Sequence, residues 1–111
     1  MIEVSVAGEE QKGGVPIDEL DGILAYFESS VSLRCKGLMS VMPNTEDRAL
    51  LRNYFTKARD LFDGIKQNNI KNVEMKYLSC GMSHDFEIAI ECGSNMIRLG
   101  RTIFGERNII I

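Results

Sequence analysis

The chain has 111 residues, of which 44% are hydrophobic and 26% charged, and its formal charge is −3. This length and composition are typical of one folded domain and exclude a disordered chain. A weakly acidic balance without a run of basic residues gives no electrostatic basis for nucleic-acid binding. No apolar stretch approaches the roughly 20 residues of a membrane span, and the acidic N-terminus is unlike a secretory signal. We therefore expect a cytoplasmic protein that binds neither nucleic acid nor membrane.

The first part of the chain predicts two strands and one helix. Residues 2–6 alternate apolar and polar side chains, which is typical of a strand. Pro16 suits the first position of a helix, and apolar residues at helical spacing continue to Phe27. A second strand is expected over residues 33–42, with a bend or bulge at Gly37.

A long helix is the clearest element of the chain. Apolar residues recur at spacings of three and four over residues 50–65, which predicts a wide buried stripe. Asn44 or Thr45 is expected to cap this helix, with Asp47 in its first turn, where the helix dipole favours negative charge.

The last part predicts two more strands and a short helix. A third strand is expected over residues 73–79, and a short helix over residues 83–92 with Ser83 as its N-cap. A fourth strand over residues 96–99 and a helical turn over residues 102–104 complete the series.

The order is thus strand then helix, four times, which predicts one α/β domain over residues 1–111 made of four βα units with parallel strands. Two architectures remain open at this point. One is a four-stranded doubly wound sheet, and the other is four consecutive units of a (β/α)8 barrel. Periodicity alone does not separate them.

The cysteine and histidine residues limit which disulfides, metal sites and catalytic sites the chain can form. Cys35, Cys80 and Cys92 are odd in number and widely spaced, without a CxxC pair, so we expect reduced thiols rather than disulfides or a zinc site. His84 is the single histidine, and no Ser-His-Asp order, HExxH, GxGxxG or Walker loop occurs. The sequence therefore predicts no metal site and no complete catalytic set.

Two turns at the carboxyl ends of the third and fourth strands are candidates for an anion site, because ligands collect at this edge of a parallel sheet. Gly81 and Gly100 remove side chains where a phosphate would approach the backbone. Ser83 supplies a hydroxyl at the start of a predicted helix, and the N–H groups of Arg101 and Thr102 could close the same cradle. The alternative is that Ser83 only caps the helix and Gly100 only makes a turn.

Arg98 is the charged residue that bears on this choice. It lies between Ile97 and Leu99 in a predicted strand, at the mouth of the sheet. A partly buried guanidinium needs an acceptor, which could be a structural carboxylate such as Asp85 or Glu91, or a ligand's ring nitrogen or phosphate. Lys12 in the first loop and the methionines of the second strand are weaker candidates, since loop lysines are usually solvated and strand methionines usually pack in a core.

The segment LSCGMSHDFEIAIECGSNMIRLGRTIFGER, Leu78–Arg107, closely resembles the C-terminal signature of the pyridoxal-phosphate (PLP) homeostasis protein family. That signature reads roughly LSMGMS-x-DF-x-x-A-I, followed by G-S-x-x-VRIG-x-x-IFG. The stretches VSVAGEEQKGG and KGLMSVMP are similar to the family's VN-x-x-x-E-x-x-K-x-G loop and its RGLM strand, in the same order. The family's fold is similar to the barrel domain of alanine racemase, so the resemblance favours the barrel.

Carried over by position, the resemblance implies a cofactor site made of Met82, Ser83, Arg98, Gly100, Arg101 and Thr102. Ser83 would bind the phosphate, and Arg98 would face the pyridine nitrogen and keep it unprotonated, which weakens the ring as an electron sink. The chain departs from the family pattern at Cys80, where a methionine is usual, at Arg101, where Ser or Thr is usual, and at Ser5, where Asn is usual.

The resemblance also implies what this chain lacks. Members of the family are longer, and the lysine that links their cofactor ends the first strand of an N-terminal half that this sequence does not match. The resemblance therefore implies the second half of a barrel that binds PLP weakly and non-covalently, or a phosphate or sulfate anion, without catalytic turnover. Because a half-barrel has open edges, a homo-oligomer or a complementary N-terminal half-barrel is expected. The alternatives are a structural or interaction half-barrel without cofactor, and part of an amino-acid racemase-like enzyme completed by another chain.

Overall fold

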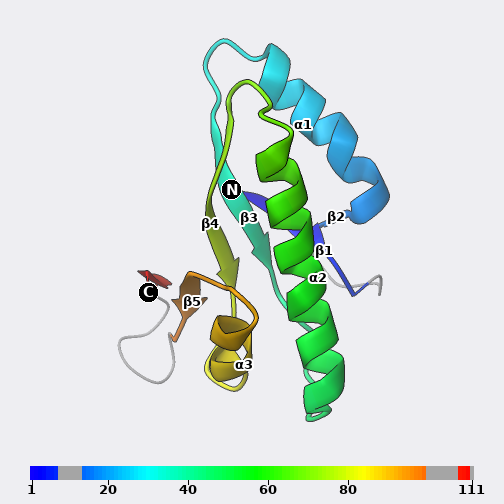
Figure 1. Ribbon diagram of the computed structural model, residues 1–111, viewed down its shortest axis with the longest axis vertical. Helices are drawn as coiled ribbons and strands as arrows, with labels where there is room; N and C mark the ends of the chain where they lie inside the picture. Colours follow the sequence, from blue (N-terminus) through cyan, green and yellow to red (C-terminus); the bar gives the residue numbers. More distant parts are fainter. Residues whose placement is uncertain (8–13, 100–107, 111) are drawn as a thin grey trace.

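The computed structural model describes residues 1–7 and 14–99 and the backbone of residues 108–110 (Figure 1). The elements in chain order are β1 (Ile2–Ser5), β2 (Val15–Pro16), a 3₁₀-helix (Ile17–Glu19), α1 (Leu20–Ser29), β3 (Cys35–Ser40), α2 (Arg48–Gln67), β4 (Val73–Cys80), α3 (Phe86–Glu91), β5 (Met96–Arg98) and β6 (Asn108–Ile110). Within the described ranges, no helix is long and apolar enough to cross a membrane.

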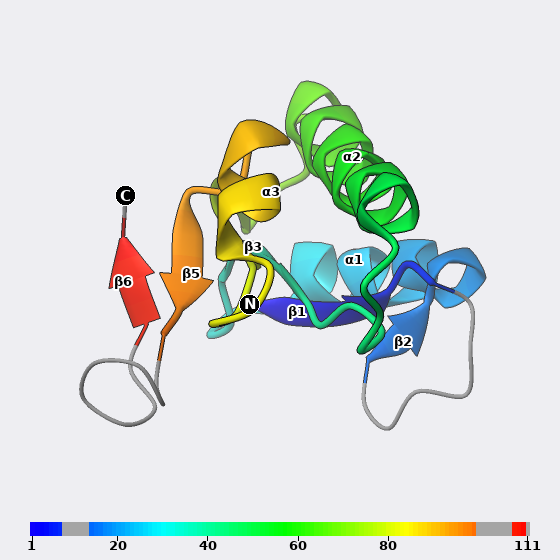
Figure 2. The ribbon, with the colours of Figure 1, turned by 90° about the horizontal axis from the view of Figure 1, so that it is seen from below.

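The strands form one open sheet in the order β2-β1-β3-β4-β5-β6. The first five are parallel, and β6 is antiparallel to β5. Figure 2 shows α1, α2 and α3 on the same face of this sheet. Strands β1, β3, β4 and β5 are neighbours in chain order, so right-handed crossovers place every helix on one side. This arrangement is that of a section of a β/α barrel and contradicts the doubly wound alternative, whose helices cover both faces.

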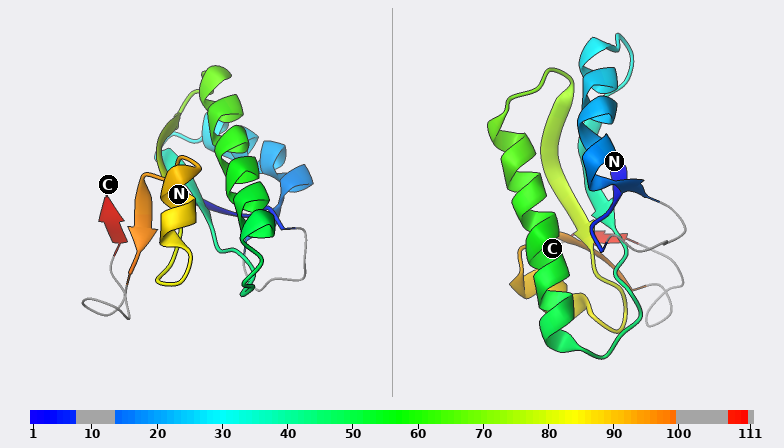
Figure 3. Two further views of the ribbon diagram at one scale, coloured as in Figure 1. Left: turned by 60° about the horizontal axis from the view of Figure 1, so that its bottom comes forward. Right: turned by 90° about the vertical axis from the view of Figure 1, so that its right-hand side faces the viewer.

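The hydrophobic core fills the space between the sheet and the helices. The predicted stripe of the long helix is confirmed, since α2 buries Leu51, Phe55, Ala58, Phe62 and Ile65. Figure 3 shows α2 running alongside β4, with α3 near the carboxyl end of that strand. The core therefore fixes the helix side of the sheet and leaves the opposite face, called the inner face below, for other contacts.

Two predicted helix starts were wrong by a few residues. Asp47, not Asn44 or Thr45, is the N-cap of α2, because its Oδ1 accepts a hydrogen bond from the Leu50 N–H at 3.0 Å. The Thr45 hydroxyl is used in the preceding turn, where it accepts from the Asp47 N–H at 3.2 Å. Pro16 ends β2 and is the N-cap of the 3₁₀-helix, one position before its first residue, and α1 begins only at Leu20.

Two polar side chains hold the connection between α3 and β5 against β4. The buried Ser94 Oγ lies 2.7 Å from the Cys80 carbonyl and accepts a hydrogen bond from the Cys80 N–H at 3.3 Å. Asn95 accepts from the Leu78 N–H at 2.8 Å and donates to the Lys76 carbonyl at 2.9 Å. These bonds fix the position of β5 beside β4.

Candidate functional site

The carboxyl ends of β4 and β5 lie side by side. The Arg98 N–H at the end of β5 donates to the Gly81 carbonyl, just after β4, at 2.9 Å. Gly81 has a φ of +110°, and a Cβ there would lie 2.9 Å from the Ala89 Cβ, so the position requires glycine. The turn that carries Met82 and Ser83 is thus anchored to the strand that carries Arg98.

Asp85 closes the turn between β4 and α3. Its buried carboxylate accepts from the Met82 N–H at 2.7 Å, and its own N–H donates to the Met82 carbonyl at 3.2 Å. The helix therefore starts only at Phe86, with Asp85 in the N-cap position, and the prediction that Ser83 is the N-cap was wrong. Ser83 lies exposed in the turn, and the Met82 N–H that an anion would need already binds a carboxylate. The Ser83 hydroxyl remains the candidate contact there.

Arg98 makes neither of the two ion pairs considered as structural partners. Glu91 pairs with Arg52 instead, at 2.7 Å between Oε1 and Nη2, and no ion pair joins Arg98 to Asp85 within the described part of the chain. The Arg98 Nε and Nη2 atoms are buried and have no hydrogen-bond partner among the described residues. Buried guanidinium nitrogens without acceptors are costly, so they indicate an acceptor supplied from outside these residues.

The strand register places Arg98 one layer above other side chains of the inner face. Met39 of β3 pairs with Ser79 of β4, which pairs with Met96 of β5, and these three side chains share one layer. Arg98 lies two residues beyond Met96 and so points to the same face, one layer nearer the carboxyl ends. Ile97, between them, faces the helices, where it would contact a Cβ on Gly81 at 3.2 Å.

Unsatisfied polar atoms gather on this inner face. Within the described ranges, the buried side-chain atoms without a hydrogen-bond partner are Ser5 Oγ, Ser79 Oγ and the two Arg98 nitrogens. Ser5 ends β1, opposite in orientation to the core residues of that strand, and Ser79 lies next to the end of β4. On the helix side, by contrast, the buried Ser40 hydroxyl bonds the Val4 carbonyl at 2.7 Å. The carboxyl end of the inner face is therefore the candidate ligand site.

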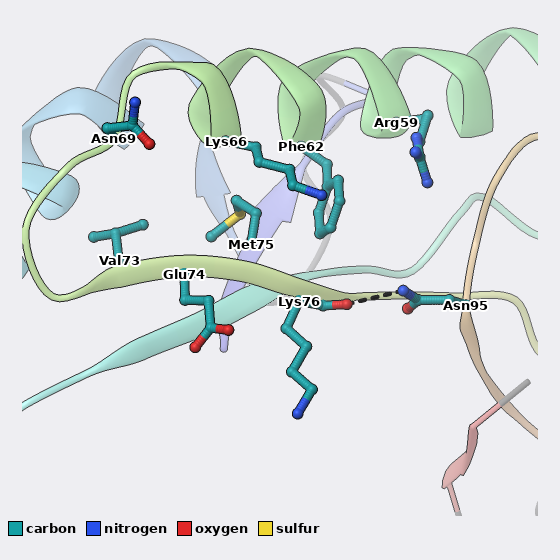
Figure 4. A pocket seen from close by; sticks show the side chains of 9 residues that line it. All are labelled: Arg59, Phe62, Lys66, Asn69, Val73, Glu74, Met75, Lys76 and Asn95. Atoms are coloured by element: carbon teal, nitrogen blue, oxygen red, sulfur yellow. Dashed lines mark hydrogen bonds between the residues drawn. The ribbon is translucent and has the colours of Figure 1, made fainter.

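A cavity of about 520 Å³ lies elsewhere, between α2 and the amino half of β4 (Figure 4). Phe62 and Met75 line it, and Arg59 reaches its edge. The Arg59 guanidinium is already engaged, with Nε 3.1 Å from Asp63 Oδ2 and Nη1 donating to the Gly93 carbonyl at 2.9 Å. Since it is on the helix side and at the other end of β4, this cavity is not part of the candidate site.

Part of the predicted site falls outside the described residues. Gly100, Arg101, Thr102 and the weaker candidate Lys12 belong to this part, as does the helical turn expected over residues 102–104, so their roles stay predictions. Among the described residues, no group of three or more His, Cys, Asp or Glu side chains could hold a metal ion.

The family model described as "Alanine racemase, N-terminal domain" matches residues 1–108. The chain belongs to the alanine racemase N-terminal domain family. It is 43% identical, over 107 residues, to the pyridoxal phosphate homeostasis protein of Aquifex aeolicus, covering 96% of this chain and 46% of that protein. The chain thus spans about half the length of the curated relatives it matches.

Two solved structures share the fold of this family member. A protein described as unknown from Bifidobacterium adolescentis aligns with a TM-score of 0.85 at 30% identity, covering 94% of this chain and 42% of that one. PipY of Synechococcus elongatus PCC7942, solved without PLP, aligns with a TM-score of 0.83 at 26% identity, covering 94% and 48%. The expected similarity to the alanine racemase barrel is thereby confirmed.

Cys80, where the family usually has methionine, behaves as an apolar side chain. Burial raises the pKa of its thiol to about 12, and the backbone of Ser40 and the positive charge of Arg98 oppose this rise only weakly. The thiol therefore stays protonated near neutral pH. All three cysteines are free, as the sequence predicted.

Sequence reasoning missed Ser5 and Ser79 as polar groups of this edge. A signal was present, because Ser79 stands between the apolar Leu78 and Cys80, and strand alternation turns it away from both. A hydroxyl pointing out of an otherwise apolar strand end indicates either a hydrogen bond to the backbone or a ligand. The sequence does not distinguish the two.

Proposed function

We propose that this chain is a non-catalytic PLP-binding half-barrel, equivalent to the carboxyl-terminal half of a PLP homeostasis barrel. The observation that carries the proposal is the pair of buried nitrogens of Arg98, at the carboxyl end of β5, that have no hydrogen-bond partner among the described residues. The similarity to pyridoxal phosphate homeostasis proteins and the order of the sequence motifs support PLP as the ligand.

Arg98 fits the pyridine nitrogen of such a ligand. A guanidinium is always protonated and can only donate, so it binds an unprotonated ring nitrogen and disfavours the pyridinium form. Bound PLP supplies an electron sink, whose strength depends on that nitrogen being protonated. An arginine at this position therefore favours a protein that binds PLP without catalysing reactions of amino acids.

Ser83 forms the proposed phosphate side of the site, next to Met82, whose N–H binds Asp85 and is not offered to the phosphate. Both are exposed in the turn that Asp85 closes, at the same edge of the sheet as Arg98. The Ser83 hydroxyl would donate to the phosphate, with Gly100, Arg101 and Thr102 as further proposed contacts. Because the family's linking lysine matches no position of this chain, PLP would be bound weakly and reversibly.

Replacing Ser83 with alanine is expected to weaken binding of PLP by about three- to tenfold, since one hydrogen bond to a charged phosphate is lost. Absorbance titration with PLP measures this effect. Calorimetry with 4-deoxypyridoxine 5′-phosphate, which lacks the aldehyde, separates site binding from reaction with surface lysines.

The matched control is Ser32→Ala, an exposed serine at the amino end of β3, where no ligand is expected. It should bind both compounds as the wild type does. If wild type, Ser83→Ala and Ser32→Ala bound the aldehyde-free compound equally, Ser83 would not contact the phosphate. Absence of binding by the wild type would reject PLP and favour the structural half-barrel.

We propose further that the half-barrel pairs with a second copy or with a complementary amino-terminal half. Within the described residues the sheet is open, since β2 pairs there only with β1 and β6 only with β5. Strand edges and a half-exposed inner face that carries Met39 and Tyr77 are liabilities in water.

Multi-angle light scattering of the chain alone is expected to give at least twice the 12.5 kDa mass of one copy. A stable 12.5 kDa species at micromolar concentration would exclude self-pairing.

A further inference from the structure

Ser79 is a fully buried polar residue that the proposed function leaves unused. The residue is 0% exposed, and its Oγ has no hydrogen-bond partner in the part of the chain that the structure describes. Its neighbours in the same layer are Met39 and Met96, whose thioether sulfurs are weak acceptors. A buried hydroxyl without a partner is less stable than a methyl group of the same shape, so the fold alone gives no reason for serine here.

On the inner face, no side chain of β4 lies between Ser79 and the carboxyl edge of the sheet. Two residues further on, Gly81 lies beyond the end of β4, and at its φ of +110° even a Cβ would point at Ala89 and Ile97 on the helix side, away from the inner face. Arg98, held to Gly81 through its backbone, reaches over this space from the adjacent strand. Ser79 and Arg98 are therefore neighbours on the inner face, one layer apart.

The unsatisfied atoms of the two residues are complementary. Arg98 has two buried N–H-bearing nitrogens without acceptors, whereas Ser79 has a hydroxyl oxygen that can accept. A ring nitrogen accepts only one hydrogen bond, so a ligand that binds one Arg98 nitrogen leaves the other without a partner. Ser79, one layer away on the adjacent strand, carries an acceptor for that second nitrogen.

We propose that Ser79 is a positioning residue for Arg98. When a phosphorylated heteroaromatic ligand binds, one guanidinium nitrogen donates to the ring nitrogen and the other donates to Ser79 Oγ, which fixes the orientation of the planar fork. This inference rests on the proposed function and adds a residue to the ring side of the same site.

Ser79→Ala tests the inference, with Ser94→Ala as the matched control, because Ser94 is another buried serine of the same region whose hydroxyl is fully bonded. In the unliganded protein, Ser79→Ala is expected to keep or raise Tm, whereas Ser94→Ala should lower Tm by about 4–8 °C. A structural role for Ser79 would instead lower Tm in both variants.

Ser79→Ala is expected to weaken binding of the ring of the ligand and to leave binding of its phosphate unchanged. Its affinity for PLP should fall by about three- to tenfold, while its affinity for inorganic phosphate stays that of the wild type. Ser79→Cys, of similar volume, should recover part of the PLP affinity. Unchanged PLP affinity in Ser79→Ala, lowered phosphate affinity, or a lowered Tm would each overturn the assignment and leave PLP binding itself standing. Failure of the wild type to bind PLP would overturn both.

Discussion

Gly37→Ala is expected to lower the free energy of unfolding by about 3 kcal/mol or more, a large fraction of the total stability of a domain of this size. A Cβ at this position of β3 would overlap the carbonyl oxygen of Tyr77 in β4. That oxygen belongs to the backbone of a paired strand, so it cannot move aside as a flexible side chain could. The register between the two strands also shifts just before Gly37, since the step from Cys35 to Gly37 in β3 spans the longer step from Val73 to Tyr77 in β4.

Gly64→Ala is the matched control. Gly64 lies within α2, and a Cβ there meets nothing within 4 Å. Alanine should therefore raise stability by about 0.5–1 kcal/mol, because it restricts the unfolded chain and favours the helix. Urea unfolding followed by circular dichroism measures both variants. Equal stability of Gly37→Ala and the wild type would mean that β3 and β4 approach less closely than described.

The bulge at Gly37 and the stripe of α2 could be predicted because both are local. A glycine within an otherwise continuous strand indicates a close approach, and apolar spacing over 20 residues defines a helix without knowledge of its partners. By contrast, β2 and β6 have only two and three residues, which is too short for any periodicity. The start of α3 was misplaced because Ser83 and Asp85 are both competent caps, and the hydrogen bonds of Asp85 with Met82 decide between them.

The sequence predicted that the candidate site contains a charged residue, but not which of its polar side chains lack hydrogen-bond partners. Arg98 stands out in the sequence as an arginine in an apolar strand. Whether it is satisfied depends on Glu91, which pairs with Arg52, 39 positions away in the sequence. Similarly, Ser79 is unsatisfied because the register sets it between two methionines of other strands. Such facts arise from tertiary contacts, which no local pattern contains.

Arg98→Met is expected to stabilise the unliganded protein and to abolish its binding of PLP. Removing two buried, unpartnered guanidinium nitrogens and keeping most of the side-chain volume should raise the free energy of unfolding by about 1–3 kcal/mol. The affinity for PLP should fall more than about tenfold, because the only proposed donor to the ring nitrogen is lost. Urea unfolding and calorimetric titration measure the two effects on the same samples.

Arg52→Met is the control, since it makes the same chemical change at an arginine whose ion pair with Glu91 is solvent-exposed. Exposed pairs contribute little, so neither stability nor PLP affinity should change appreciably.

Arg98→Lys adds a second comparison, because lysine keeps the charge but loses the planar fork of the guanidinium. This variant should bind PLP poorly and should not gain stability. A substitution that raises stability and lowers ligand affinity indicates that the original side chain serves binding and not folding. If Arg98→Met were less stable than the wild type, the guanidinium would have a partner within the fold, and its assignment to the cofactor would fail.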